Sequence, residues 1–236
     1  MNAGSVQAES PLRGLLSGEP ATIAPWTARW ESARIGFCLA AILLGAGCYG
    51  AAMGFWRSPQ QAWFVALKFP LIILLTAIGN GLLNAMLAPL LGLSLSLRQS
   101  FMAILMSFAI ASAILGSFSP VVAFLVWNAP PMGTGPASQQ AYVIIQLAHV
   151  VVIAFAGITA NLRLAQLLRY FSAGPGAARR VLCAWLLGNL FFGSQLSWIL
   201  RPFIGSPGLP VEFLRPDAFH GNFYETVLNS LLHLLD

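Results

Sequence analysis

Lys68 is a full positive charge inside an apolar run, Trp63-Phe-Val-Ala-Leu-Lys68-Phe-Pro70. A charge within a membrane span is costly and is by default a candidate for function, here the binding of a substrate. The alternative is structural. Lys68 follows Trp63 by five residues, so its long stem can carry the ammonium group to the headgroup level of a bilayer.

Three polar side chains recur every four residues further along the same run, at Thr76, Asn80 and Asn84. This spacing places them on one face of a helix. Amide side chains in a membrane bind neighbouring helices by hydrogen bonds, and the stripe is interpreted first as helix packing. The alternative is that Asn80 and Asn84 line the path of a polar substrate.

Gln146 and His149 stand three residues apart in a later apolar run, which predicts a shared helix face. Together with Lys68, Gln195 and Arg201 they fall in the half of the bilayer that the topology below makes the outer half. These side chains could converge in one outward-facing polar pocket. For His149 two other interpretations stay open: a packing histidine, or the axial ligand of a haem or chlorophyll-type pigment.

The sequence offers little else with catalytic potential. None of the predicted spans contains Asp or Glu, so a carboxylate proton relay is missing. Short motifs for phosphate binding, zinc proteases or serine hydrolases are not found. Cys38, Cys48 and Cys183 have no metal-binding spacing and are interpreted as small buried hydrophobes. We therefore expect neither an enzyme nor a metal site, and no cofactor unless His149 holds one.

Composition decides which class of protein must position these residues. The 236 residues are 58% hydrophobic and only 8% charged, against about 25% charged in a typical soluble domain. The net charge of +5 is spread thinly and forms no basic stripe, which excludes a nucleic-acid partner. The lipid bilayer is the expected surrounding, and the predicted class is a polytopic membrane protein.

Five apolar stretches are long enough to cross a bilayer as helices. They are residues 35–55, 63–83, 101–127, 142–162 and 181–200. The second apolar run continues to residue 97, so a break is expected in residues 84–92. The predicted fold is thus an all-α bundle, with a polar tail (residues 1–33) before the five-span domain (34–201) and residues 202–236 after it.

The first span carries Ala46, Gly50 and Gly54 at intervals of four. Small residues at this spacing form a helix face that another backbone can approach closely. We expect this face to pack against another helix.

The end of the last span has a distinct pattern. Trp198 and Arg201 are residue types that sit at the headgroup level, and Pro202 ends the helix. A Gly/Pro-rich segment follows, here called the elbow (residues 202–221). Asn222 and Glu225 then predict the start of a short amphipathic surface helix. Its apolar stripe comprises Tyr224, Val227, Leu228, Leu231 and Leu235.

The distribution of basic residues predicts the orientation. With the N-terminus inside, eight arginines fall on the cytoplasmic side and three on the other, which agrees with the positive-inside rule. The predicted location is a bacterial inner membrane, with the N-terminal tail cytoplasmic and the C-terminal helix outside.

Lys68-Phe-Pro70 at the start of a span, five spans and a basic cytoplasmic loop together resemble the bacterial Yip1-like membrane proteins. The segment SQLSWILRPFIGSP is similar to a recurrent end-of-span segment in small bacterial membrane proteins. The resemblance implies a small polytopic membrane protein and no catalytic residues.

Three functions follow from these patterns. The first is a non-enzymatic membrane subunit or scaffold that packs against other membrane proteins in a complex. The second is a transport or channel component for a small solute, with the outward-facing polar pocket. The third is an accessory subunit that holds a pigment or haem through His149.

Overall fold

The computed structural model describes residues 11–17, 19–28, 30–93, 95–172 and 174–235. Within these residues the protein is all-helical, as predicted, and five helices are long and apolar enough to cross a membrane. These are α3 (Ser32–Phe55), α4 (Pro59–Leu90), α5 (Leu97–Trp127), α6 (Pro136–Phe171) and α7 (Pro175–Ile199). Two short helices precede them, α1 (Pro11–Ser17) and α2 (Pro20–Ala28), and α8 (Phe223–Leu235) follows them. The protein is therefore an integral membrane protein with five spans.

The spans are longer than the apolar stretches that predict them, because local signals extend the helices. Ser58 caps α4 by accepting a hydrogen bond from the Gln61 N–H at 3.1 Å, and Pro59 occupies the first turn. α6 and α7 likewise begin with proline in their first turn. α4 then continues without interruption through Pro70 to Leu90.

The break between the second and third spans begins at Leu91, later than predicted, because α4 remains helical through residues 84–90 and only residues 91 and 92 of the predicted interval lie outside it. Gly92 adopts a φ of 88°, which a side chain would disfavour, and so reverses the chain after α4. Ser96 and Gln99 then form a reciprocal capping box that starts α5.

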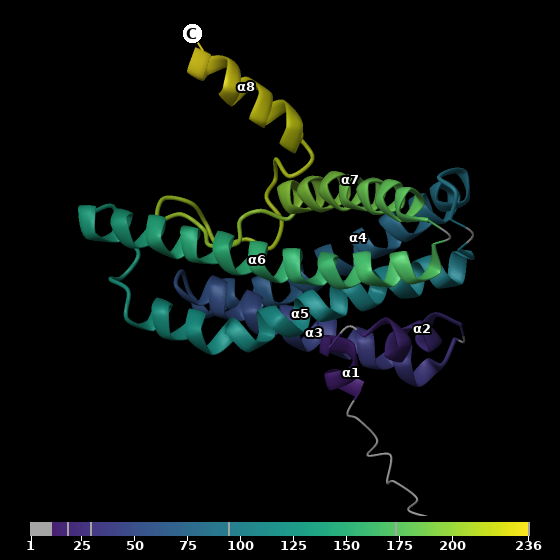
Figure 1. The fold of residues 1–236 in the computed structure, drawn as a ribbon. Coiled ribbons are helices and arrows are strands. Elements are labelled where there is room, and N and C mark those ends of the chain that lie inside the picture. Colours follow the sequence, from purple (N-terminus) through teal and green to yellow (C-terminus); the bar gives the residue numbers. More distant parts are fainter. Residues whose placement is uncertain (1–10, 18, 29, 94, 173, 236) are drawn as a thin grey trace, which may run out of the picture.

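The spans lie side by side (Figure 1), and their contacts form a ring in the order α3, α5, α6, α7, α4. α4 and α5 also contact one another across the ring. α3 and α5 are in close backbone contact, since a methyl group on Gly45 would collide with the backbone of Ser112 and one on Gly116 with the backbone of Gly45. The core consists of apolar side chains from this ring, among them Ile42, Ile104 and Trp185.

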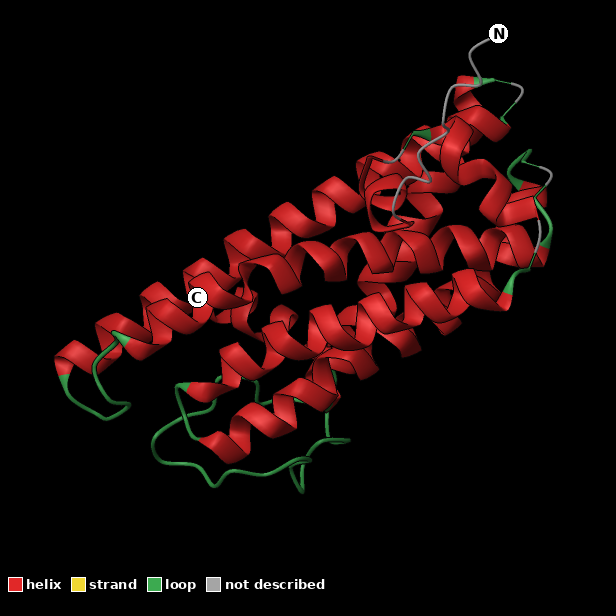
Figure 2. Ribbon diagram, turned by 90° about the horizontal axis from the view of Figure 1, so that it is seen from below, coloured by secondary structure: helices red, strands yellow, loops and turns green. Residues whose placement is uncertain are grey.

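The loops gather at the two ends of the bundle (Figure 2). At one end, here called the basic end, lie α1, α2, residues 91–96 and the connection from α6 to α7. At the other, the elbow end, lie the α3–α4 and α5–α6 connections and the elbow. Residues 1–33 are predicted to form a polar tail, but α1 and α2 pack on α5, with Leu15 and Ile23 buried. Residues 1–10 lie outside the described part.

Candidate functional site

Lys68 is completely buried, although it carries a full charge within a span. Its Nζ donates hydrogen bonds to the carbonyl oxygens of Pro202 at 3.2 Å and Glu212 at 3.4 Å. It also lies 5.3 Å from the centre of the Phe213 ring, a cation–π distance. All three partners belong to the elbow, so the ammonium group is occupied by the protein itself rather than directed to the headgroups or to an open pocket.

Two other donors hold the elbow against the same end of α4. The Gln61 side chain donates to the carbonyl oxygens of both Pro202 and Phe203 at 2.9 Å. Arg57 donates to the carbonyl oxygen of Leu209 at 3.1 Å. Gln61 and Arg57 are not part of the sequence prediction. The feature that could identify them in the sequence is their position, since both are polar side chains at or just before the start of a span.

Asn80 and Asn84 share a buried face of α4, as their spacing predicts. The Asn80 amide donates to the backbone oxygen of Trp185 at 3.1 Å and to Oδ1 of Asn189 at 2.5 Å. The Asn84 amide donates to the backbone oxygen of Asn80 and to its Oδ1. Trp185 and Asn189 belong to α7, so the stripe connects two spans by hydrogen bonds. This geometry is that of helix packing.

Gly188 makes the contact between α4 and α7 possible. A methyl group at this position would overlap Oδ1 of Asn80. Sequence reasoning did not include Asn189, although Gly188-Asn189 repeats the Gly79-Asn80 pair of α4.

His149 and Gln146 lie in different surroundings. The His149 ring is 4% exposed, and its Nδ1 is 2.8 Å from the hydroxyl oxygen of Tyr49 on α3. The two rings meet edge to face at 5.5 Å. The Nε2 atom of His149 is buried and has no hydrogen-bond partner among the described residues. Gln146, one turn earlier, is exposed on the outside of the bundle.

Arg201 and Gln195 position the end of the chain. The Arg201 guanidinium stacks on the Trp198 ring at 3.7 Å and forms an ion pair with Asp217 at 3.2 Å. Oε1 of Gln195 accepts a hydrogen bond from the backbone N–H of Phe223 at 3.2 Å, at the first residue of α8. Arg201 therefore fixes the elbow, and Gln195 fixes the start of α8.

The five side chains predicted to form one polar pocket are thus not brought together. Lys68 and Arg201 hold different parts of the elbow, Gln195 binds α8, His149 binds Tyr49, and Gln146 faces outward.

The small-residue face of α3 is used inside the protein. A methyl group on Gly50 would lie 2.5 Å from the carbonyl oxygen of Val65, and one on Gly54 would lie 2.6 Å from that of Gln61. Ala46, one turn before Gly50, is fully buried. The helix that approaches the Gly50–Gly54 face is therefore α4 of the same chain.

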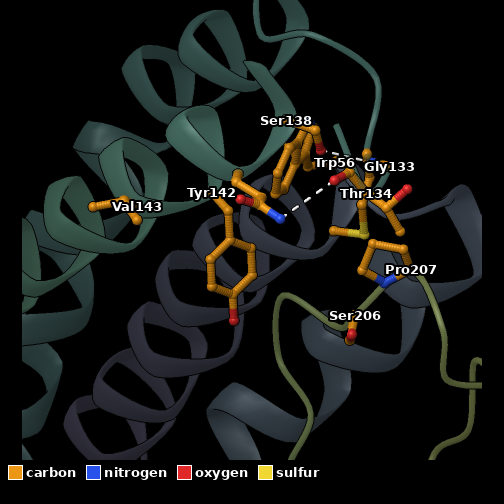
Figure 3. Close-up of a pocket in the computed structure, with 10 residues that line it drawn as sticks. Trp56, Gly133, Thr134, Ser138, Tyr142, Val143, Ser206 and Pro207 are labelled. Carbon is orange, nitrogen blue, oxygen red and sulfur yellow. Dashed lines mark hydrogen bonds between the residues drawn. The ribbon is translucent and has the colours of Figure 1, made fainter. Parts of the chain in front are cut away.

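A pocket of about 440 Å³ opens at the elbow end. It lies between the end of α3, the α5–α6 connection, the first turns of α6 and the elbow (Figure 3). Its lining includes Trp56, Thr134, Ser138, Tyr142, Ser206 and Pro207. None of the residues predicted from the sequence as substrate-binding lines it.

The hydrogen bonds of the site connect side chains to backbone carbonyls and to one another. Groups of three or more His, Cys, Asp or Glu side chains that could hold a metal ion are not found among the described residues. No family model, no curated protein and no solved structure matches the chain.

Proposed function

We propose that the chain is a non-enzymatic integral membrane subunit that packs against another membrane protein through the surface formed by α7 and α8. The observation that carries the proposal is the uncovered apolar stripe of α8. Tyr224, Val227, Leu228 and Leu232 are all exposed, and α8 rises away from the bundle (Figure 1). The side chains of Leu231 and Leu235, which the sequence places in the same stripe, lie outside the described part.

The first turn of α8 is held firmly on α7. The Tyr224 ring stacks on Phe191 at 5.9 Å, and the Tyr224 hydroxyl lies 2.7 Å from Oγ of Ser194. Asn222 caps the helix by accepting a hydrogen bond from the Glu225 N–H at 2.8 Å. An isolated helix of this length is marginal in water. A helix that is fixed at one end and apolar on one side gains stability from a second surface that covers its stripe.

α7 supplies the other half of the proposed interface. It packs on α4 and α6, while Leu187, Leu190 and Phe191 remain exposed. The Phe191–Tyr224 stack makes this surface continuous with α8. The junction also carries the polar Ser194–Tyr224 pair, a type of group that joins helices in membranes. This combination favours a protein partner over lipid alone.

The polar side chains of the spans support this proposal over transport of a solute. Lys68 is bound by the elbow, Asn80 connects α4 to α7, and Nδ1 of His149 is bonded to Tyr49. These three side chains thus have a structural use within the chain. We further infer a bacterial inner membrane with the basic end in the cytoplasm, which the excess of arginines at that end supports.

Photo-crosslinking in the native membrane tests the proposal. A photoreactive residue replaces Leu187 on α7 or Leu228 on α8, and Val151 on the exposed side of α6 serves as the reference position. We expect one and the same protein adduct from Leu187 and Leu228, and lipid adducts from Val151. If all three positions give only lipid adducts, the proposal is refuted.

A pair of matched variants connects the adduct to α8. Leu228→Asp places a charge in the apolar stripe and should remove the adduct formed from Leu187. Thr226→Asp places the same charge on an exposed threonine of α8 outside the stripe and should retain it. An adduct that survives both substitutions would show that α8 takes no part in the interface.

A further inference from the structure

We propose that the pocket at the elbow end binds a neutral sugar ring, either as the headgroup of a glycolipid or as a free saccharide. The proposal does not depend on the partner interface of α7 and α8, which lies on other elements. It begins with the size of the pocket. A volume of about 440 Å³ falls within the range of small-ligand sites, about 300 to 1,000 Å³.

The charge of the lining limits the class of ligand. None of the residues that line the pocket is acidic, basic or a histidine. The Arg57 guanidinium is not part of the lining: it donates to the carbonyl oxygen of Leu209 at 3.1 Å and contacts the sulfur of Met132 at 4.0 Å. A phosphate or carboxylate would lose its hydration without gaining a cation, and an amine would find no carboxylate. The lining therefore selects an uncharged ligand.

Unused hydroxyl groups give the pocket its polar character. Thr134, Tyr142 and Ser206 line it, and none of their side-chain hydroxyls has a hydrogen-bond partner among the described residues. Each hydroxyl can both donate and accept. Such a set suits a ligand that itself carries several hydroxyl groups around one ring.

The aromatic residues of the lining supply an apolar surface beside these hydroxyl groups. Tyr142 is half-buried and its ring lies 6.0 Å from that of Trp56, whose own ring is almost fully buried. Trp56 thus packs beside Tyr142 at a tilt of 38°, and the Tyr142 hydroxyl lies at the end of the pocket where Ser206 is found (Figure 3). An aromatic ring with hydroxyls beside it matches the apolar face and polar edge of a sugar. A cage for a quaternary ammonium group requires several exposed aromatic faces instead.

The rim of the pocket is held in place before a ligand binds. The indole of Trp56 donates to the carbonyl oxygen of Pro130 at 2.9 Å, and the Gly133 N–H donates to Oγ of Ser138 at 2.7 Å. The amide of Gln139 donates to the carbonyl oxygen of Thr134 at 3.3 Å. These bonds fix the α5–α6 connection against α3 and α6, and a preformed site loses less entropy on binding.

The position of the pocket explains why the bound sugar can be the headgroup of a lipid. Val143 lines the pocket and is exposed on α6, and Leu147 lies one turn further along the same outer side. An acyl chain attached to the bound ring can follow these side chains along the span. Tyrosine and tryptophan are also the residues that sit at the headgroup level of a bilayer.

Binding is measured on the full-length chain in a polyoxyethylene detergent, because maltoside or glucoside detergents would occupy the proposed site. The probes are monoglucosyl diacylglycerol, phosphatidylglycerol, free glucose and free choline, and retention is followed by native mass spectrometry and calorimetry. We expect the glucolipid to bind more tightly than phosphatidylglycerol. Binding of both glucose and the glucolipid would assign the site to the sugar itself, and binding of the glucolipid alone would assign it to lipid headgroups.

Two conservative variants make the test specific. Tyr142→Phe combined with Ser206→Ala removes two hydroxyls and keeps the shape, and the loss of two neutral hydrogen bonds should weaken glucolipid binding about tenfold. Tyr170→Phe, at an exposed tyrosine of the basic end, is the control and should bind as the unmodified chain does. Equal binding of glucolipid and phosphatidylglycerol, preference for choline, absence of glucolipid binding, or equal effects of the two variants would overturn the proposal.

Discussion

The close approach of α3 and α4 leads to a sharp prediction for Gly50→Ala. The new methyl group would lie 2.5 Å from the carbonyl oxygen of Val65 and 3.1 Å from Cβ of Phe69. Ordinary contacts need about 3.5 Å, so the two helices must separate by roughly 1 Å at this point. Both colliding partners are rigid, since one is backbone and the other is a first side-chain carbon. Overpacking of this kind typically costs about 1 to 3 kcal/mol.

Gly36→Ala on the same helix is the matched control. A methyl group there meets nothing within 4 Å. Because alanine is the better helix former by about 1 kcal/mol in exposed positions, Gly36→Ala should be neutral or stabilising. The free energy of unfolding is measured for both variants by titration with a denaturing detergent, at equal expression and with membrane insertion confirmed.

The result that would refute the reasoning is a Gly50→Ala protein as stable as the Gly36→Ala protein. α3 and α4 would then be further apart than the structure places them. The Gly50–Gly54 face would then be available to another chain, as one interpretation of the sequence allows.

Three further predictions concern the amides, the histidine and the topology. Asn189→Ala removes the acceptor of the Asn80 amide and should lower the free energy of unfolding by about 0.6 to 2 kcal/mol in the same titration, as hydrogen bonds between membrane helices do; an unchanged value would contradict a structural role. His149→Leu should leave any visible absorbance of the purified protein intact, because its ring is only 4% exposed and packs edge to face on Tyr49; loss of a visible band would restore the haem or pigment interpretation. Cysteine labelling should reach residues 165–180 only from the cytoplasm and residues 205–228 only from the opposite side, and labelling of both from one side would rule out five spans.

The number of spans could be predicted from the sequence, whereas their lengths could not. Apolar runs reveal the part of a helix that lies in hydrocarbon. α6 extends from Pro136 to Phe171, well past the predicted residues 142–162. Its last turns contain Arg163 and Arg169, which look like the end of a span in a hydropathy analysis. Arginine, leucine, alanine and glutamine are all good helix formers, so the helix continues through them.

Spacing along a helix predicted two shared faces, and the structure has one of them but not the other. Asn80 and Asn84 are four residues apart and are both buried, with Asn80 bonded to α7 and Asn84 bonded to Asn80. Gln146 and His149 are three apart, which leaves an angle of about 60° between them on a helix of 3.6 residues per turn. On a helix with a narrow buried face this angle is enough to place one side chain inside and the other outside. Partners distant in sequence, such as Tyr49 for His149, cannot be obtained from spacing at all.

The burial of α1 and α2 also could not be predicted from the pattern of apolar residues in the sequence. Leu15 and Ile23 lie in short helices, and the nearby large apolar side chains of Leu12 and Leu16 are exposed, so the two buried residues do not belong to a long buried apolar stripe. They are buried because α5 and the end of α6 offer a surface at the basic end. Tertiary contact thus decides the structure of a segment whose composition is that of a tail.

The physical reason for a lysine inside α4 lies in the backbone of the elbow. Pro202, Pro207, Pro210 and Pro216 prevent this segment from forming a helix, so its carbonyl oxygens have no regular partners. Near the membrane such oxygens must be satisfied by other donors. A lysine ammonium, an amide and a guanidinium from one end of α4 and the turn before it supply them at four elbow carbonyls. The charge that looks functional in the sequence is therefore the donor that an irregular, proline-rich segment requires. Because the elbow also lines the pocket at this end and leads to α8, these donors position both surfaces that we propose to bind a ligand or a partner.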